Sequence, residues 1–237
     1  TNASGGNFEN LAVNSTPAVT NVTDTVDTST VSLTATPSVA EGGTILYTAS
    51  VGAPVTGSPV VVTLTNGQSI TIPVGQSSGT ATGAVSNDVY QGHAAVTNSI
   101  SNVSGGNYEN LVADKTAVST SVTDVQDTTT VSLSATPSVA EGGQIVYTAT
   151  LTNAAQTPVT VTLSNGQTIT IAANQTSGSI SVATHGDNPY LDAGQVSTRI
   201  TNALGGNFEN LAVNSTPAVT NVTDTVDTST VSLTATP

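Results

Sequence analysis

Pairs of acidic residues recur along this chain at intervals of one hundred residues. The members of each pair are three residues apart, and the pairs are Asp24/Asp27, Asp124/Asp127 and Asp224/Asp227. Little positive charge balances them, because 15 acidic residues face only Lys115 and Arg199, and the formal net charge is −13. Carboxylates held close together repel one another unless a cation neutralises them. Hard oxygen ligands suit Ca²⁺, which takes about six to eight of them. The acids therefore favour a calcium site over the alternative of a solvated acidic surface.

The other groups capable of chemistry give little support for catalysis. His93 and His185 occupy non-equivalent positions, and no nucleophile recurs beside either of them. The chain has no cysteine, so disulfide bonds are not used. We therefore expect no enzyme activity.

The chain repeats itself with a period of one hundred residues. Residues 1–37 and 201–237 are identical except for Ser4 and Leu204, and a diverged copy occupies 104–137. A period this long indicates an array of whole domains, because the units of solenoid proteins are much shorter. We predict four segments: a C-terminal fragment of a preceding repeat, two full repeats, and the first strand of another, at 1–27, 28–127, 128–227 and 228–237. The two end pieces are expected to fray or to pair with another chain, because strands without a sheet expose their edges.

Each repeat is predicted to form about seven short β-strands. Apolar and polar residues alternate over 31–35 and 45–51, as in a half-buried strand. Asn66-Gly67 between two apolar runs indicates a tight hairpin. Further strands are expected at 80–85, 94–103 and 111–122. About one hundred residues and seven strands predict an all-β fold of tandem immunoglobulin-like β-sandwiches arranged end to end.

The loop positions of the acids predict where they gather. Strand direction alternates in such a sandwich, so the first and fifth connections lie at the pole where the last strand leaves. The acids expected there are Glu41, Asp88, Asp124 and Asp127 in the first repeat, and Glu141, Asp187, Asp224 and Asp227 in the second, with Asp192 as an alternative to Asp187. Glu109 and Glu209 are expected at the opposite pole, facing the preceding linker.

Composition excludes several partners. The acidity excludes nucleic acid and anionic membranes, which need basic patches. No apolar run is long enough to span a bilayer, and we expect no direct insertion into a membrane. Since the sequence opens within a repeat, we interpret it as an internal part of a longer protein.

Four motifs together resemble a known family. They are TVSLTATPSVAEGG…YTA, the turn NGQ.ITI, the loop GGN[FY]ENL and the junction VTDxxDT[ST]TV. This combination resembles the repeats of giant, type I-secreted Gram-negative biofilm adhesins of the LapA type. The resemblance implies an extracellular extender on the bacterial cell surface, stiffened by Ca²⁺ between neighbouring repeats, with the adhesive ligand bound elsewhere in the protein. The ligand positions that it implies are the two sets of four acids named above, and the same junction motif includes Asp24 and Asp27.

Three functions are compatible with the sequence. The first is a structural spacer of a surface adhesin, and the second is a module that binds glycans or a partner protein. The third is a calcium-dependent enzyme or accessory domain, which the lack of a convergent catalytic set disfavours. Near-identity of successive repeats favours the spacer.

Overall fold

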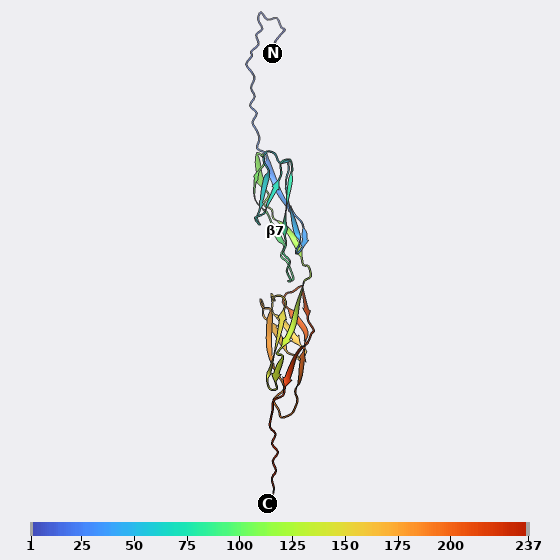
Figure 1. Ribbon diagram of the computed structural model, residues 1–237. Coiled ribbons are helices and arrows are strands. Elements are labelled where there is room, and N and C mark those ends of the chain that lie inside the picture. The colour runs from blue at the N-terminus through green and yellow to red at the C-terminus, as the bar shows by residue number, and fades with distance from the viewer. Residues whose placement is uncertain (1, 236–237) are drawn as a thin grey trace.

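The protein is elongated and consists of two β-sandwiches in series. The computed structural model describes residues 2–235, which form twenty β-strands and no helix. Two strand-rich bodies follow one another along one axis, and the segments before and after them extend from opposite ends (Figure 1). The predicted all-β fold of tandem β-sandwiches is confirmed. None of the described residues belongs to a helix that could cross a membrane.

The first repeat contains ten strands, and the second repeats them almost residue for residue. The first set is β1 (Thr28–Ala35), β2 (Ser38–Ala40), β3 (Thr44–Val51), β4 (Val60–Leu64), β5 (Ser69–Ile72), β6 (Ser78–Ala84), β7 (Val96–Asn98), β8 (Ile100–Gly105), β9 (Asn110–Ala113) and β10 (Val118–Thr123). The second set is β11 (Thr128–Ala135), β12 (Ser138–Ala140), β13 (Gln144–Leu151), β14 (Val159–Leu163), β15 (Thr168–Ile171), β16 (Ser177–Ala183), β17 (Gly194–Thr198), β18 (Ile200–Gly205), β19 (Asn210–Val213) and β20 (Ala218–Thr223).

Each sandwich has a four-stranded layer and a divided second layer. In the first repeat the four-stranded sheet has the order β6-β3-β1-β9, in which only the β1–β9 pair is parallel. The other layer consists of the sheets β2-β10-β7 and β5-β4-β8. Because only Ser99 separates β7 from β8, these two sheets continue one another along the chain. The second repeat has the same strand orders.

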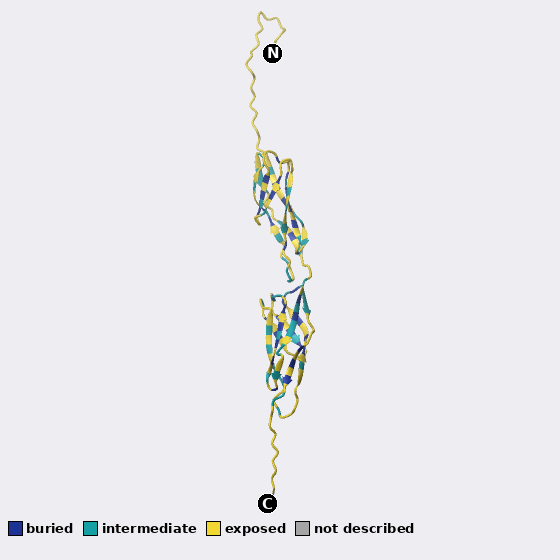
Figure 2. Ribbon diagram, viewed as in Figure 1, coloured by how far each residue is buried: buried dark blue, intermediate teal, exposed yellow. Residues whose placement is uncertain are grey.

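The core of each repeat is built from aliphatic residues around one tyrosine, and the core of the second repeat also includes Phe208. In the first repeat Ile45, Tyr47 and Ala49 point inward from β3, and their neighbours in the strand are half-buried or exposed. Tyr147 takes the place of Tyr47 in the second repeat, where its hydroxyl accepts a 2.8 Å hydrogen bond from the buried Thr198 hydroxyl. Buried residues lie within the two bodies, whereas the extended ends are mostly exposed (Figure 2). The alternation predicted from the sequence thus produces the core.

The structure has ten strands per repeat where the sequence predicts seven, because the chain changes sheets within single apolar runs. The run 94–103 divides at Ser99, and β7 pairs with β10 whereas β8 pairs with β4. The run 111–122 divides where Asp114 Oδ1 accepts the backbone N–H of Thr116 (2.9 Å) and forms a turn. A hydrogen bond from the Thr116 hydroxyl, together with this backbone bond, holds the pKa of Asp114 below its ordinary value. Pro37 lacks an N–H and separates β1 from the short strand β2.

The predicted hairpin forms, but with a longer turn. β4 and β5 pair in antiparallel register, and four residues, Thr65, Asn66, Gly67 and Gln68, lie between them. Only Gly67 has a positive φ, of 85°, and its N–H donates to the Leu64 carbonyl (3.0 Å). The two-residue turn that Asn-Gly suggests would need positive φ at both residues, so the loop is instead a turn closed by a glycine in the left-handed region.

Replacing Gly67 by alanine is expected to lower the free energy of unfolding of the first repeat by about 1–2 kcal/mol. An added Cβ at Gly67 meets no neighbour within 4 Å, so the cost is that of a left-handed backbone for a residue with a side chain. Gly52→Ala is a matched control, because Gly52 also has open space and its φ is not in the positive region. Chemical denaturation should separate the two variants, and equal stabilities would contradict the assignment of strain to this turn.

The segments outside the two sandwiches form no strand. This applies to residues 2–27 and 224–235, most of which are exposed. Their pairing with another chain stays a prediction, and residues 1, 236 and 237 lie outside the described part of the chain.

Candidate functional site: an acidic junction between the repeats

Glu41 organises the pole of the first repeat that faces the second. It lies in the turn between β2 and β3, is only 4% exposed, and accepts two backbone N–H groups. Val125 donates to Oε1 at 2.7 Å and Asp88 donates to Oε2 at 3.2 Å. These bonds hold three segments together: the β2–β3 turn, the β6–β7 loop and the chain that leaves β10. The Val125 N–H, followed by that of Asp88, keeps the pKa of Glu41 below its ordinary value despite burial.

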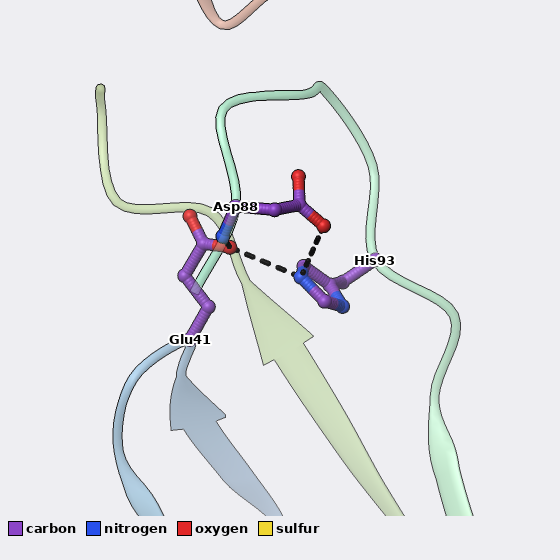
Figure 3. A group of neighbouring side chains, drawn as sticks. All are labelled: Glu41, Asp88 and His93. Carbon is purple, nitrogen blue, oxygen red and sulfur yellow. Dashed lines mark hydrogen bonds and ion pairs between the residues drawn. The ribbon is translucent and has the colours of Figure 1, made fainter. Parts of the chain in front are cut away.

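Asp88 and His93 approach Glu41 from the loop between β6 and β7. Figure 3 shows the three side chains converging, with Asp88 and His93 on one loop and Glu41 on another segment. His93 Nε2 lies 3.0 Å from Glu41 Oε2 and 3.5 Å from Asp88 Oδ2. The other oxygen of Asp88 accepts the Tyr90 N–H at 2.8 Å and shapes the loop. The three ligand atoms lie within 4.8 Å of one another.

Asp124 and Asp127 lie on the linker that leads into the second repeat. Asp124 Oδ2 accepts the N–H of Gly92 at 2.9 Å, which fixes the linker against the same loop. Asp127 Oδ2 accepts the side-chain N–H of Asn87 at 2.6 Å. The structure therefore brings the carboxylate of Asp124 to Glu41, whereas that of Asp127 is held to one side by Asn87.

Glu209, from the second repeat, completes the junction. Its Oε2 accepts the N–H of Asp127 at 2.5 Å, and its carboxylate lies within 4.8 Å of those of Glu41 and Asp124. Its other oxygen, Oε1, is buried and has no hydrogen-bond partner. Although the Asp127 N–H favours the charged form, burial and the nearby Glu41 and Asp124 carboxylates raise the pKa of Glu209. Three carboxylates from two domains thus meet in one small volume.

Sequence reasoning did not include Glu209 among the ligands. It placed Glu209 at the pole facing the preceding linker, and the structure has it there. The step that was missing is that this pole and the acidic pole of the preceding repeat face each other across a four-residue linker, 124–127. The short linker, with acidic loops on both sides of it, is the sequence feature that could have identified Glu209 as a ligand.

An aromatic contact joins the repeats beside the acids. The Tyr90 ring stacks on Phe208 with a centroid separation of 5.6 Å and an interplanar angle of 24°. The backbone of 89–91 pairs with that of 207–209 through Glu209 N–H to Val89 carbonyl and Gln91 N–H to Asn207 carbonyl, both 3.0 Å. The Tyr90 hydroxyl also donates to the Ala154 carbonyl at 2.7 Å. We call Tyr90, Phe208 and these hydrogen bonds the aromatic latch, which packs Tyr90 against the second core.

Comparison with known protein families identifies the family to which both repeats belong. A family model described as the LapA domain matches residues 27–125 and again residues 127–225. The chain belongs to the LapA domain family. The resemblance to LapA-type adhesin repeats is therefore confirmed, and the tandem copies are adhesin-related repeats. No similar protein was found among curated sequences.

The second LapA domain carries the same pole with altered residues. Glu141 is buried, and its Oε1 accepts the backbone N–H (2.8 Å) and the hydroxyl (2.9 Å) of Thr225. Asp187 accepts the same Thr225 hydroxyl. His185 Nδ1 lies 3.8 Å from Glu141 Oε2 and 3.7 Å from Asp192 Oδ2. Asp192, the alternative considered for this loop, is therefore the acid that joins Glu141 and His185 in one group.

Loop geometry identifies the counterpart of Asp88 in the second LapA domain. Asn188 Oδ1 accepts the Tyr190 N–H at 2.9 Å, as Asp88 does for Tyr90. A side chain at Gly142 would face Asp187, as one at Gly42 would face Asn87. Asp187 therefore takes the place of Asn87, and an amide takes the place of the Asp88 carboxylate.

The remaining acids named from the sequence lie at the two outer ends. Asp224 and Asp227 border a hollow with Tyr190 and Leu191, and Asp224 Oδ1 is buried without a hydrogen-bond partner. Asp24 and Asp27 lie on the exposed segment before the first domain. The Asp27 N–H donates to Glu109 Oε2 at 2.5 Å, which repeats the contact between Asp127 and Glu209.

The donors at the junction fit a hard divalent cation. Glu41, Asp124 and Glu209 offer only oxygen atoms, which is the ligand type of Ca²⁺. Glu209 Oε1 is buried and accepts no hydrogen bond within the described residues, so its lone pairs are available to a cation. A hollow of about 370 Å³ lined by Gln91, Asp124, Gln126 and Glu209 gives room for an ion and its water. Calcium ligation by this set is chemically reasonable on these grounds.

Proposed function

We propose that the chain is part of an extender in a cell-surface adhesin, in which Ca²⁺ bound between successive LapA domains holds them in line. The observation that carries the proposal is the position of Glu209. This carboxylate belongs to the second domain, yet it lies with two carboxylates of the first in a space that one ion could fill. A cation held there would be bound by both domains at once.

Charge is the physical argument for an ion at this place. Three like charges within 4.8 Å oppose the alignment of the domains. Lys115 and Arg199 make no ion pair with these acids among the contacts of residues 2–235. Calcium would replace the repulsion by attraction and turn a short linker into a fixed connection. Such a site would resist changes in ionic strength better than a contact between surface charges.

Glu41, Asp124 and Glu209 would hold the ion, with Asp88 next to Glu41 and Asp127 next to Glu209. Calcium would supply positive charge and oxygen coordination across the domain boundary. The backbone N–H groups of Val125, Asp88 and Asp127 keep the carboxylates of Glu41 and Glu209 aimed at the junction. Within residues 2–235 the second domain has Glu141 and Asp224 but no following domain to supply the third acid. We propose that Glu141, Asp187, Asp224 and Asp227 act in the same way when a further repeat follows, and that Asp24 and Asp27 do so with Glu109.

The setting of this function would be the bacterial surface. Membership in a family of adhesin repeats supports a surface location, and near-identical tandem domains support a spacer that projects an adhesive region found elsewhere in the protein. Millimolar extracellular calcium is sufficient for weak sites of about 10⁻⁴–10⁻³ M. A contribution to biofilm formation would follow from the length and stiffness of such a tether.

The second candidate is a module that binds glycans or a partner protein. The hollow at the junction favours it, since Gln91 and Gln126 offer amide groups beside two acids. In that case a polar ligand would compete with calcium for Asp124 and Glu209. A glycan array in which the chain binds a sugar, with loss of that binding in Gln91→Ala, would favour this function over the spacer.

Glu209→Gln is expected to lower the calcium affinity of the junction at least about tenfold, because affinity follows the number of charged ligands. Glutamine keeps the shape of the side chain and an oxygen for the Asp127 N–H. Glu109→Gln is the matched control for the junction between the two domains, since Glu109 makes the same contact with Asp27 at the outer pole of the first domain, where residues 2–27 include no counterpart of the buried Glu41. Calorimetric titration with calcium should show the loss only for Glu209→Gln. Equal affinity in the two variants would remove Glu209 from the site.

A further inference from the structure

Both histidines of the chain lie against the buried glutamate of their own domain. The chain contains only two histidines, and they come from different places in the loop between the sixth and seventh strands of each repeat. His93 precedes β7, whereas His185 follows β16. Even so, His93 reaches Glu41 and His185 reaches Glu141, the equivalent residue. An aspartate joins each pair, Asp88 in the first domain and Asp192 in the second.

The distances within these two groups suit a small metal ion. Tetrahedral ligands with Zn–N and Zn–O bonds of about 2.0–2.1 Å lie about 3.3 Å from one another. In the first group the imidazole nitrogen lies 3.0 and 3.5 Å from the two carboxylate oxygens, and in the second 3.8 and 3.7 Å. One nitrogen and two carboxylate oxygens leave a fourth position for water, as zinc sites with three protein ligands do.

Unpartnered atoms point into both groups. Glu141 Oε2 is buried, on a side chain with no exposed surface, and has no hydrogen-bond partner. His93 Nε2 is also buried without a hydrogen-bond partner, 3.0 Å from Glu41 Oε2. Donor atoms that converge on a common point are the arrangement that a metal ion satisfies. Figure 3 shows the imidazole of His93 facing the carboxylates of Glu41 and Asp88, with dashed lines for the two contacts.

We propose that each LapA domain of this chain has a site for a transition-metal ion such as Zn²⁺, formed by Glu41, Asp88 and His93 in the first domain and by Glu141, His185 and Asp192 in the second. Imidazole nitrogen selects zinc over calcium, which prefers oxygen. Each site lies within a single domain, and the second needs no acid from another repeat. The sites therefore do not depend on calcium binding at the junction, although Glu41 belongs to both groups. Zinc at these sites would fix the loop between the sixth and seventh strands, which in the first domain carries Tyr90.

Zinc titration of the full chain, free of any histidine tag and saturated with calcium, tests the proposal. We expect one ion per histidine by calorimetry. Co²⁺ used as a spectroscopic probe should give the intense visible absorption of a tetrahedral site with a nitrogen ligand. His93→Gln and His185→Gln should each remove one ion, or weaken its binding at least about tenfold. The double variant should bind neither ion.

The Glu209→Gln variant distinguishes zinc binding from calcium binding. Glu209 lies outside both histidine groups, so this variant should keep both zinc ions while it loses calcium affinity. The double histidine variant should keep its calcium affinity, so the two proposals can fail separately. Wild-type chain that binds no zinc, or a double histidine variant that binds zinc as the wild type does, would overturn the inference.

Discussion

Replacing Tyr90 by alanine is expected to let the two LapA domains hinge even when calcium is saturating. The substitution removes the stack on Phe208 and the hydrogen bond to Ala154. An aromatic pair contributes about 0.5–1.5 kcal/mol and a hydrogen bond a similar amount. A loss of about 1–3 kcal/mol would raise the population of open junctions roughly 5–150-fold. Both sandwiches should stay folded, because Tyr90 belongs to a loop.

Tyr190→Ala is the matched control for this experiment. Tyr190 occupies the same place in the loop of the second domain, but it is 75% exposed and meets no following repeat within residues 2–235. The chain has no cysteine, so Ser69→Cys and Thr168→Cys create a unique pair for spin labels on exposed positions of the two domains. The distance distribution between the labels should broaden for Tyr90→Ala and not for Tyr190→Ala. Equal distributions would show that the aromatic latch does not restrain the junction.

Much of the architecture could be predicted because it depends on local pattern. Alternation over 45–51 places Tyr47 and its inward neighbours in the core, and the hundred-residue period sets the number of domains. Alternating strand direction also brings Glu41, Asp88 and Asp124 to one pole, where the hydrogen bonds to Val125, Asp88 and Gly92 hold them. These features require no knowledge of how one domain meets the next.

The features that could not be predicted depend on contacts between loops. Glu209 joins the site only because the GGNFEN loop of the second domain faces the linker. The stacking of Tyr90 on Phe208 depends on the path of a loop without periodic sequence. The role of Asp192 was left open because Asp187-Asn188 stand in the second repeat where the first has Asn87-Asp88, so the sequence does not decide which acid of this loop replaces Asp88. The histidines were set aside as non-equivalent in sequence, yet in space each lies beside the same glutamate.

Glu41, the glutamate of the AEGG turn, takes part in both proposed metal sites of the first domain. Glu41 belongs both to the oxygen-only group at the junction and to the group that contains His93. Because it also fixes Val125 and Asp88, its replacement would disturb the linker and the latch loop together. Glu209 is therefore the better residue for testing calcium, since it contributes only to the junction.

Removal of calcium is expected to convert a straight pair of domains into a hinged one. The charge repulsion among Glu41, Asp124 and Glu209 would then act unopposed, and the aromatic latch alone would hold the domains in line. Sodium chloride at high concentration serves as a control, because it screens exposed charges without bridging the two domains. Glu209→Gln in calcium should resemble the wild type in chelator.

Small-angle scattering of the wild-type chain in calcium, and then in chelator, tests the central claim most directly. We predict a larger maximum dimension with calcium, with a pair-distance distribution typical of two aligned bodies. In chelator we predict a smaller average dimension and a broader distribution that high salt does not restore. An unchanged maximum dimension and distribution on calcium removal would contradict calcium rigidification and leave the acids as a solvated surface.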